Sequence, residues 1–594
     1  MMLQALYQYY QRLLDDPNSQ IAPPGFQHVG FSHAIVLKMD GRFSHFLTLT
    51  QDKTPKTLLV PQAVKKTSGV SSNLLWENPF YIFGIPKNDT KKDQERAVKQ
   101  QEAFLDRIKD VFGEAESFPE IQAIMRFVEA NPFDQAKQDP IWPEVLEAGR
   151  NLCFRIEGQE GAVTDQKPIK TIIAKSAKTS TGSVNVQCLV TGDIAPVAEL
   201  HPAIAGVWDA QTAGANIVSF NMESVTSYGL KKGENAPVSE EAAFAYTTVL
   251  NHMLRKGSSQ RMQVGDASTV FWTDEPNDPV VDEFALLLSG PPKESKPSVE
   301  QEVEPIRKLL SAVQSGHLPE ADDKKFFYIL GLGPNAARIA IRFWHQGSVN
   351  EIRKRLAEHF QDIEMTGPTN RSPHPRLYFL LLSTALQAKA ANVMPNLGGE
   401  VFRAILGGLP YPRAFMQQAL LRTRAEQEVT QERAAIFKAS INRNLRQGNT
   451  QEKELTMALD PDNTHHAYLL GRLFAAIERT QRLALGGDVN ATLRDRFYAS
   501  ASSTPTSVMP WLQRMNTQHM RKLRREKPGA AFNLEKLIGT IMDLMPAEGY
   551  PSYLPPEDQG RFAVGYYHQR QDFFTKKSND TETEPVTEEE QSHE

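Results

Sequence analysis

Apolar positions in the first residues of the chain recur with the period of a helix. They are Leu3, Leu6, Tyr7, Tyr10, Leu13 and Leu14. Spacings of three and four residues place these side chains on one helical face, and we expect the helix to end at Asp16-Pro17 because proline cannot continue it. Two strand-like runs then flank Asp40-Gly41, a dipeptide typical of two-residue hairpins. Residues 57–61 predict a third strand.

The middle of the chain changes its period several times. Residues 90–130 predict helices with apolar anchors at Phe104, Ile108, Phe112, Ile121, Ile124 and Phe127. Strands are predicted within residues 168–222, in the runs KTIIAKSAK, VNVQCLVTGD and ANIVSFNME. Residues 239–256 predict a helix, and STVFWTD predicts a strand. Residues 289–305, rich in Pro, Ser and Glu, are typical of a linker or exposed loop.

The stretch YILGLGPNAARIAIRFW (328–344) contains G-x-G-x-x-A at 331–336, a variant of the dinucleotide-binding fingerprint. We expect a strand over 325–330 and a helix over 336–344 that packs through Ala337, Ala340, Ile341 and Trp344. A nucleotide site would need a further strand and an acid about 20 residues past the glycines. A second helix is predicted there instead, and Pro334 removes a backbone donor. We therefore favour a structural turn, and expect no cofactor.

The order of these elements predicts two folded parts. A chain of 594 residues is too long for one core. We expect an α+β N-terminal domain with antiparallel strands and helices over residues 1–455. From residue 334 onward the predicted elements are almost entirely helical. An all-α helical bundle should occupy residues 456–575, and residues 576–594 should form a disordered acidic tail.

Charge is unevenly distributed along the chain. The net charge is −5, and removing the seven negative charges of residues 578–594 leaves +2. These acids are Asp580, Glu582, Glu584, Glu588, Glu589, Glu590 and Glu594. The folded body is thus nearly neutral, with basic patches that suit an acidic partner, although solvated charged faces are also common.

The cysteine count and the lengths of the apolar segments also indicate the cellular compartment. Two cysteines, Cys153 and Cys188, are too few for a disulfide framework or a zinc knuckle, and a reducing cytoplasm is the natural interpretation. The start of the chain lacks the continuous apolar run of a signal peptide. Because no segment approaches the ~20 apolar residues that cross a bilayer, we expect no membrane association.

Catalytic chemistry is difficult to assemble from this sequence. His465 and His466 are adjacent, so they cannot share a helical face as zinc ligands at i and i+4 do. His345 and His374 have no neighbouring acid or cysteine cluster. Asp266, Asp274 and Glu275 could mimic a group of metal-binding acids, but DEPNDP is more typical of a turn. We find no nucleophile motif and no phosphate-binding loop, and expect the protein not to be an enzyme.

Three basic segments are candidates for nucleic-acid contact. In the first, Lys65 and Lys66 can neutralise phosphates, Gly69 permits close backbone approach, and Ser71, Ser72 and Asn73 can read base edges. The alternative is a surface turn before the apolar run whose Trp76, Phe80, Tyr81 and Phe83 we assign to the core.

The second segment is a polar loop containing Ser227, Tyr228, Gly229, Lys231 and Lys232. It can contact DNA or a neighbouring subunit, or be a structural turn. In the third, Arg514, Arg521 and Arg525 share one helical face, flanked by Lys522 and Arg524. Such a face can follow a single-stranded backbone, although it can equally be a solvated surface. Further helical candidates for RNA or subunit contacts are Arg338, Arg342, Arg403, Arg413, Arg443 and Arg446.

Several long segments carry a family resemblance. They are LQALYQYYQRL, KKTSGVSSNLLWENPFYIFGI, CLVTGDIAPVAELHPAI, IVSFNMESVTSYGLKKGENAPVSEEAAFAYTTVLN, YILGLGPNAARIAIRFW and GYYHQRQDFF. Together they run nearly end to end, and the chain resembles the large subunit of the type I-C CRISPR Cascade surveillance complex (CRISPR-associated family, subtype Dvulg large subunit).

The resemblance implies a non-catalytic, RNA-guided role in antiviral defence. Its expected partners are double-stranded target DNA, CRISPR RNA, the backbone, 5′-handle-binding and small subunits, and a helicase-nuclease. The large subunit would recognise the protospacer-adjacent motif, aid duplex opening, stabilise the R-loop and recruit the nuclease, while base pairing reads the target. The alternatives are a CRISPR RNA-processing nuclease and a nucleotide-binding enzyme using the 331–336 turn.

The resemblance also directs attention to Met457. Some complexes of this type obtain their small subunit by internal translation of the large-subunit gene. Met457 precedes a helix-patterned segment, and the purine-rich codons of residues 451–454 could supply a ribosome-binding sequence. We therefore expect Met457 to be a possible internal start, although it can also be an ordinary residue flanking a helix.

Overall fold

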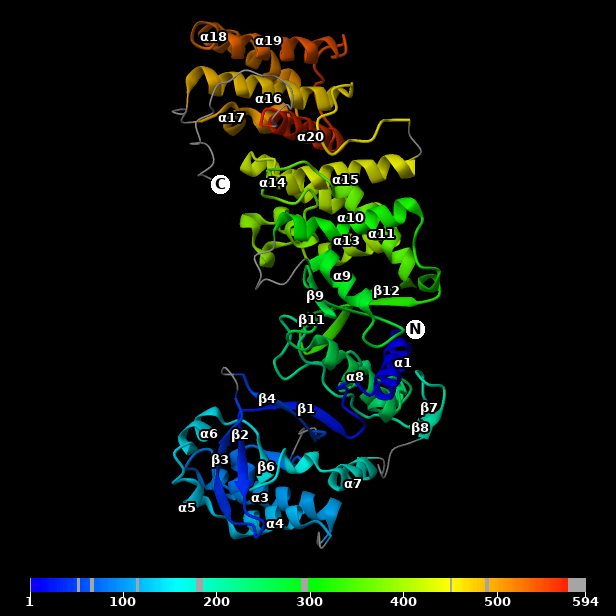
Figure 1. The fold of residues 1–594 in the computed structure, drawn as a ribbon, viewed down its shortest axis with the longest axis vertical. Helices are drawn as coiled ribbons and strands as arrows, with labels where there is room; N and C mark the ends of the chain where they lie inside the picture. The colour runs from blue at the N-terminus through cyan, green and yellow to red at the C-terminus, as the bar shows by residue number, and fades with distance from the viewer. Residues whose placement is uncertain are drawn as a thin grey trace. The chain divides into compact units, whose positions relative to one another are not determined.

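The computed structural model describes residues 2–50, 54–64, 69–113, 117–177, 185–289, 298–448, 451–486 and 491–574 (Figure 1). Two compact units divide the chain. The first unit contains residues 1–205 and 213–252, and the second contains residues 206–212 and 253–594. The predicted tail over 576–594 lies outside the described residues.

The first unit begins with α1 (Met2–Asp15), as its helical pattern predicts. Its main sheet has the order β3-β2-β6-β5 and contains β2 (His33–Leu37), β3 (Phe43–Thr48), β5 (Trp76–Glu77) and β6 (Leu152–Ile156). The Asp40-Gly41 hairpin is confirmed, with Gly41 at a φ of 92° that favours glycine. Only the β2–β6 pair of this sheet is parallel among the described strands. β1 (Phe26–Phe31) and β4 (Lys56–Pro61) form a separate antiparallel ribbon.

Helices complete the core of this sheet. They are α2 (Pro79–Phe83), α3 (Lys91–Phe112), α4 (Pro119–Ala130), α5 (Phe133–Ala136), α6 (Trp142–Ala148) and α7 (Lys167–Ala177). Aromatic rings fill the space between sheet and helices, and Phe83 contacts both Phe127 and Trp142. The helices predicted within residues 90–130 and the core positions of Trp76, Tyr81 and Phe83 are confirmed, whereas Phe80 is only half-buried.

The strand prediction over residues 168–222 is largely wrong. Residues 167–177 form α7, because Ile169 and Ile173 lie four residues apart and bury one helical face despite their β-branched side chains. Residues 215–223 make only an isolated bridge from Ala215 to Ile204 and a short 3-10 turn. The short strands β7 (Asn185–Gln187) and β8 (Ile194–Pro196) pair in this part, and α8 (Glu240–Leu254) agrees with its prediction.

The second unit contains an antiparallel sheet of order β12-β11-β10-β9. Its strands are β9 (Arg261–Val264), β10 (Ala267–Thr273), β11 (Phe326–Asn335) and β12 (Arg338–Ser348). The helix predicted over 336–344 is therefore wrong, because β11 and β12 form a hairpin through Ala336 and Ala337. A Cβ on Gly331 would lie 2.3 Å from the Phe343 ring, and one on Gly333 would lie 2.4 Å from Arg342. The two glycines thus make room for side chains of the partner strand.

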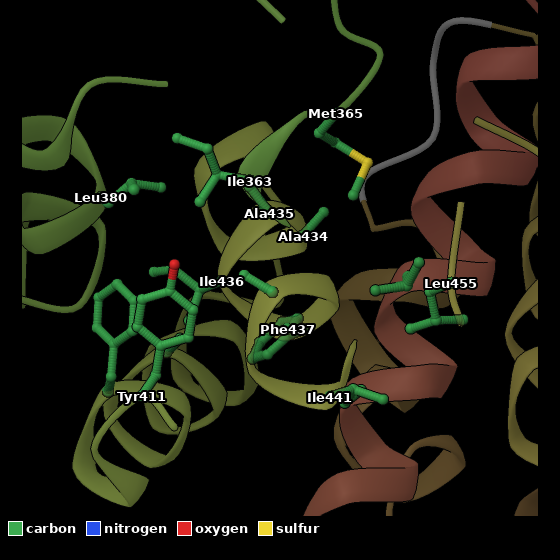
Figure 2. Close-up of a cluster of buried hydrophobic side chains, with 14 of the residues drawn as sticks. Ile363, Met365, Leu380, Tyr411, Ala434, Ala435, Ile436, Phe437, Ile441 and Leu455 are labelled. Atoms are coloured by element: carbon green, nitrogen blue, oxygen red, sulfur yellow. The ribbon is translucent and has the colours of Figure 1, made fainter. Parts of the chain in front are cut away.

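Helices surround one apolar core in the second unit. They include α9 (Pro279–Ser289), α10 (Val299–Ser315), α11 (Val349–Ile363), α12 (Leu377–Ser383), α13 (Leu397–Gly407), α14 (Arg413–Glu426) and α15 (Gln431–Gly448). Figure 2 shows Ala434, Ile436, Phe437 and Ile441 of α15 within this core. The linker predicted over 289–305 is wrong for its second half, since Ser298 caps α10 through the backbone N–H of Gln301.

The last helices pack as a bundle. They are α16 (His466–Leu485), α17 (Leu493–Ala501), α18 (Pro505–Glu526), α19 (Pro528–Asp543) and α20 (Pro556–Asp572), with α18 beside α19 and α16 beside α20 (Figure 1). α20 also packs against α15, since a Cβ on Gly560 would lie 3.2 Å from Ile441 and 3.6 Å from Phe437. One apolar core therefore includes residues on both sides of position 455. The predicted order of a mixed α/β region followed by helices is confirmed. The proposed boundary at 455/456 lies inside the second unit and stays a prediction.

Candidate nucleic-acid interface

Hydrogen bonds connect the described residues on either side of the first candidate segment. The backbone N–H of Val64 donates to Oδ1 of Asn73 (3.0 Å), and the Asn73 N–H donates to Oε1 of Glu77 (3.2 Å). Nearby, Nε1 of Trp76 donates to the carbonyl of Pro61 (2.9 Å). Asn73 therefore holds Val64, the last described residue before this segment, close to the start of β5, and we call the Val64–Asn73 contact the neck hydrogen bond.

The residues of this segment that we predict to contact DNA differ in how far they are buried. Gly69 is exposed at a φ of 80°, and Ser71 is half-buried. Ser72 and Asn73 are only 4% and 5% exposed, and the Ser72 hydroxyl donates to the carbonyl of Asn73. Lys65 and Lys66 lie outside the described residues. In this conformation Gly69 and Ser71 are available to a ligand. Ser72 and Asn73 are buried and bonded within the protein instead.

The second candidate loop presents a fully exposed aromatic ring. Tyr228 is 100% exposed and has a φ of 53°, the left-handed region that most side chains avoid. The side chain of Asn235 fixes the loop: its Oδ1 accepts from the Ser227 N–H, and its Nδ2 donates to the carbonyls of Leu230 and Lys232.

The two lysines of this loop differ in their surroundings. Both are exposed, but Nζ of Lys232 lies 2.5 Å from the carboxylate of Glu199. Lys231 forms no ion pair within the described part of the chain. Among Ser227, Tyr228, Lys231 and Lys232, the ring of Tyr228 and the ammonium group of Lys231 are thus the groups most available to a ligand.

The third candidate, on α18, forms the clearest surface. Its buried side chains include Val508, Met509, Leu512, Met520 and Leu523. Arg514, Arg521 and Arg525 lie on the opposite, exposed face, and none of them forms an ion pair with another described residue. We call these three residues the arginine stripe. Three unneutralised guanidinium groups in a row suit an anionic polymer.

The other two basic residues predicted for α18 are already paired. Arg524 binds the carboxylate of Glu535 on α19, and Lys522 lies 4.0 Å from Glu526. Their charges are therefore partly neutralised within the protein. Sequence spacing placed all five cations on one helix but did not reveal the acid on α19.

Trp511 was missed by the sequence analysis. It is 47% exposed and lies one turn before Arg514, on the same side of α18 as the arginine stripe. Its ring packs against Phe497 with centroids 4.8 Å apart, which fixes the orientation of the indole. An exposed aromatic ring in line with arginines resembles the stacking platforms that bind single strands. The i, i+3 spacing to Arg514 was the available signal.

The remaining arginine candidates are divided between structural and exposed positions. Arg443 is buried and pairs with Asp362 (2.5 Å), and Arg446 pairs with the same carboxylate. Arg342 pairs with Asp266 (2.8 Å). Arg403 donates to a backbone carbonyl but is exposed, as is Arg413. Arg443 is therefore unavailable to RNA in this conformation.

The acids considered for metal binding have other partners. Asp274 accepts hydrogen bonds from the Phe326 N–H and the Tyr328 hydroxyl, and Glu275 pairs with Lys325. Within the described ranges, no group of three or more His, Cys, Asp or Glu side chains could hold a metal ion. The helices described there also include none that is both long and apolar enough to cross a membrane.

Comparison with protein families gives one match across nearly the whole chain. The model of the CRISPR-associated protein family Cas_Csd1 matches residues 6–574. This range includes all three candidate segments and the whole of the described fold after residue 5. No curated protein matches the chain. This match is consistent with the large subunit of a type I-C Cascade, and it shows that the chain belongs to the CRISPR-associated Cas_Csd1 family.

Proposed function

We propose that this chain is the non-catalytic large subunit of a type I-C Cascade effector. In this role it recognises the protospacer-adjacent motif in duplex DNA, aids opening of the duplex, supports the displaced strand and helps recruit the helicase-nuclease. Membership in the Cas_Csd1 family supports a role in a CRISPR effector complex. The observation that carries the DNA-binding part is the arginine stripe in line with Trp511.

The loop that contains Gly69 and Ser71 is our candidate for motif recognition. Gly69 lets backbone approach the groove, Ser71 supplies a hydroxyl for base edges, and Lys65 and Lys66 neutralise phosphates. Asn73 and Ser72 hold the loop in position through their hydrogen bonds. Motif recognition by this loop therefore depends on two kinds of residue, those that contact DNA and those that support them.

The loop around Tyr228 is our candidate for a second contact. A fully exposed ring on an internally hydrogen-bonded loop can stack on a base or insert into an adjoining subunit, and Lys231 adds a positive charge. Stacking on a base and insertion into a subunit differ in how their affinities depend on salt. Affinity for DNA falls as salt is added, because stacking on a base is accompanied by a phosphate contact.

The arginine stripe is our candidate for the displaced strand. Guanidinium groups track the phosphates while Trp511 stacks on a base, a combination that tolerates any sequence. This lack of sequence preference suits the displaced strand, whose sequence changes with every target. Further contacts with CRISPR RNA, the other subunits and the helicase-nuclease follow from the proposed role.

The proposal is tested with the assembled complex on target DNA. The complex should bind a matched duplex carrying the correct adjacent motif, and a complex assembled without this chain should lose that preference. Neither the isolated chain nor the nuclease-free complex should cleave DNA or hydrolyse a nucleotide. Equal affinity for correct and scrambled motifs in the presence of the chain would contradict motif recognition, and metal-dependent cleavage would contradict the non-catalytic assignment.

The alternative functions gain no support from the glycine stretch. Gly331 and Gly333 lie within a hairpin strand and face Phe343 and Arg342, rather than opening a helix. The fingerprint needs a helix N-terminus at this point to hold a pyrophosphate. A CRISPR RNA-processing nuclease remains testable by adding repeat RNA to the isolated chain, and we expect no cleavage.

Internal translation from Met457 is a further part of the proposal. Met457 lies in the segment before α16, which begins only at His466, and its carbonyl accepts from the Thr366 N–H (2.9 Å). A fragment from Met457 would contain α16–α20 and the arginine stripe. It would also expose the surface of α20 that contacts α15 near Gly560.

The test uses a gene with a C-terminal tag. We expect a short tagged product beside the full-length chain, and its loss when the Met457 codon is changed to a leucine codon. Absence of the product, or its persistence after the change, rules out initiation at this position.

A further inference from the structure

The arginine stripe has a candidate occupant within this chain. Arg514, Arg521 and Arg525 are exposed and lack acidic partners in the described ranges, although Lys522 and Arg524 on the same helix have them. A row of like charges at spacings of seven and four residues repels itself unless an anion lies along it. An anionic segment within reach of the stripe would relieve this repulsion.

The end of α20 packs against an apolar cluster to which α16, α18 and α19 contribute. Phe573 packs against the apolar cluster that contains Met520 and Leu523 of α18. The guanidinium of Arg479 lies 5.9 Å from the centroid of the Phe573 ring and 5.4 Å from that of Phe574. The chain after Phe574 therefore starts from a defined point on the same helical bundle that carries the arginine stripe.

The sequence after this point is strongly acidic. Residues 578–594 carry seven acids and no Lys or Arg, and only Lys576 and Lys577 precede them after α20. Six of the acids form two groups, with Asp580, Glu582 and Glu584 in the first and Glu588, Glu589 and Glu590 in the second, and Glu594 follows both groups. Seven carboxylates exceed the three guanidinium groups of the stripe, so the stripe can be fully neutralised.

The lengths of segment and stripe agree. At 1.5 Å per residue, Trp511 and Arg525 lie about 21 Å apart along α18. A random coil of 17 residues has an end-to-end distance of about 20–25 Å. Because the segment is tethered to the same helical bundle as the stripe, its effective concentration there is in the millimolar range. Carboxylates at that concentration can compete with a nucleic acid for the same guanidinium groups.

We propose that residues 578–594 dock along the arginine stripe and compete there with single-stranded nucleic acid. Docking requires only the charges of the segment and the stripe. Competition rests in addition on the proposed function of the stripe as a single-strand surface. The acidic segment would thus weaken binding of short or accidental single strands, and a long displaced strand would replace it.

Docking is tested without nucleic acid. Donor and acceptor dyes whose energy transfer acts only over distances shorter than the segment's end-to-end distance of about 20–25 Å are placed in the full chain at Gln518→Cys and Ser592→Cys, which is feasible because Cys153 and Cys188 are buried. We expect efficient energy transfer at about 50 mM salt, and a marked decrease at about 500 mM, where the Debye length is only several ångströms. The same decrease should follow Arg514→Gln, Arg521→Gln and Arg525→Gln together. If energy transfer between the dyes changes neither with salt nor with these substitutions, the proposed docking is wrong.

Competition is tested with a fluorescent single-stranded DNA of about 20 nucleotides, longer than the site of one binding module. A chain with its seven acids replaced by Asn or Gln should bind this probe about fivefold more tightly at about 50 mM salt, and equally at about 500 mM. Replacing the stripe should abolish the difference. If neutralising the segment does not raise the affinity for the probe, or if the affinity still rises when the stripe is replaced, the proposed competition is wrong. If neither chain binds the probe, the proposed function of the stripe fails, while energy transfer still reports docking.

Discussion

At the scale of single residues, Asn73 links the fold to the proposed recognition of DNA. Asn73→Ala removes the acceptor of the part-buried Val64 N–H, and a hydrogen bond of this kind typically contributes about 0.5–1.5 kcal/mol. We expect a less stable first unit and weaker motif discrimination. Ser71→Ala, on the half-buried side of the loop, should reduce discrimination without this loss of stability.

The comparison uses chemical unfolding of the chain and affinity of the assembled complex for correct and scrambled motifs. Asn73→Ser keeps an uncharged acceptor oxygen and serves as the control, so it should preserve more stability than Asn73→Ala. If Asn73→Ala changes neither stability nor discrimination, the neck hydrogen bond does not position the loop. Lys65→Ala with Lys66→Ala should weaken binding to both motifs and reduce its salt dependence.

A second residue-scale prediction concerns His568 on α20. Its pKa is lowered to about 3, mainly by burial, with the nearby cations Lys438 and Arg472 acting in the same direction and Asp460 opposing them. The ring lies 3.0 Å from the Tyr468 hydroxyl and 3.3 Å from the sulfur of Met365. Below its unfolded pKa of about 6.5, only the unfolded chain binds this proton, so stability falls as pH falls towards 3.

The expected slope from this one group is at most about 1.4 kcal/mol per pH unit. His568→Gln should reduce the loss of unfolding free energy between pH 7 and pH 5, measured by denaturant titration. His359, whose pKa is also lowered by burial, contributes in the same direction and should remain in the variant. An unchanged pH slope in His568→Gln would show that this histidine is not buried in its neutral form.

At the scale of elements, two glycines set the distance between α16 and α20. A Cβ on Gly471 would lie 2.0 Å from the carbonyl oxygen of Phe562, and one on Gly565 would lie 2.2 Å from that of Tyr468. Either alanine must push the helices apart, and overpacking of this kind typically costs about 1–3 kcal/mol or more. The matched control is Gly539→Ala on α19, where nothing lies within 4 Å.

We expect Gly471→Ala and Gly565→Ala to lower the unfolding midpoint, and Gly539→Ala to raise it slightly because alanine favours helix by about 1 kcal/mol. Thermal or urea unfolding of the three variants measures this. Equal behaviour of the three would contradict the close packing of α16 and α20.

The elements also show how far the sequence could predict the fold. Helical spacing located α1, α3, α4 and α8 correctly, because their apolar faces are long and regular. It failed for residues 336–344, where alanines and arginines favour a helix locally but pairing with β11 decides the structure. The opposite error occurred at α7, where isoleucines suggested a strand although their spacing buries one helical face.

At the scale of the whole molecule, the candidate surface was only partly predictable. Spacing identified the arginine stripe, since residues on one face of a single helix need no tertiary information. It could not show that Arg524 meets Glu535 on the next helix, or that Asn73 turns inward to Val64. These contacts form where the chain turns back on itself between neighbouring elements, which helical spacing alone does not predict.

The family assignment rests on the whole chain rather than on one site. The Cas_Csd1 match covers residues 6–574, whereas the DNA-binding roles of the individual residues are our proposals. The central claim is that an unneutralised face of α18 supports a DNA strand. Its most direct test removes equal charge from the free and the paired cations of the same helix.

That measurement is the affinity of the assembled complex for a target duplex over a range of salt concentrations. Arg514→Gln with Arg521→Gln removes two free charges, and Lys522→Gln with Arg524→Gln removes two paired charges. The first pair should weaken binding about tenfold and reduce the salt slope by about 1.4, since each single-strand phosphate contact contributes about 0.7. The second pair should change both values little. Equal effects of the two pairs, or no effect of the first, would contradict the account.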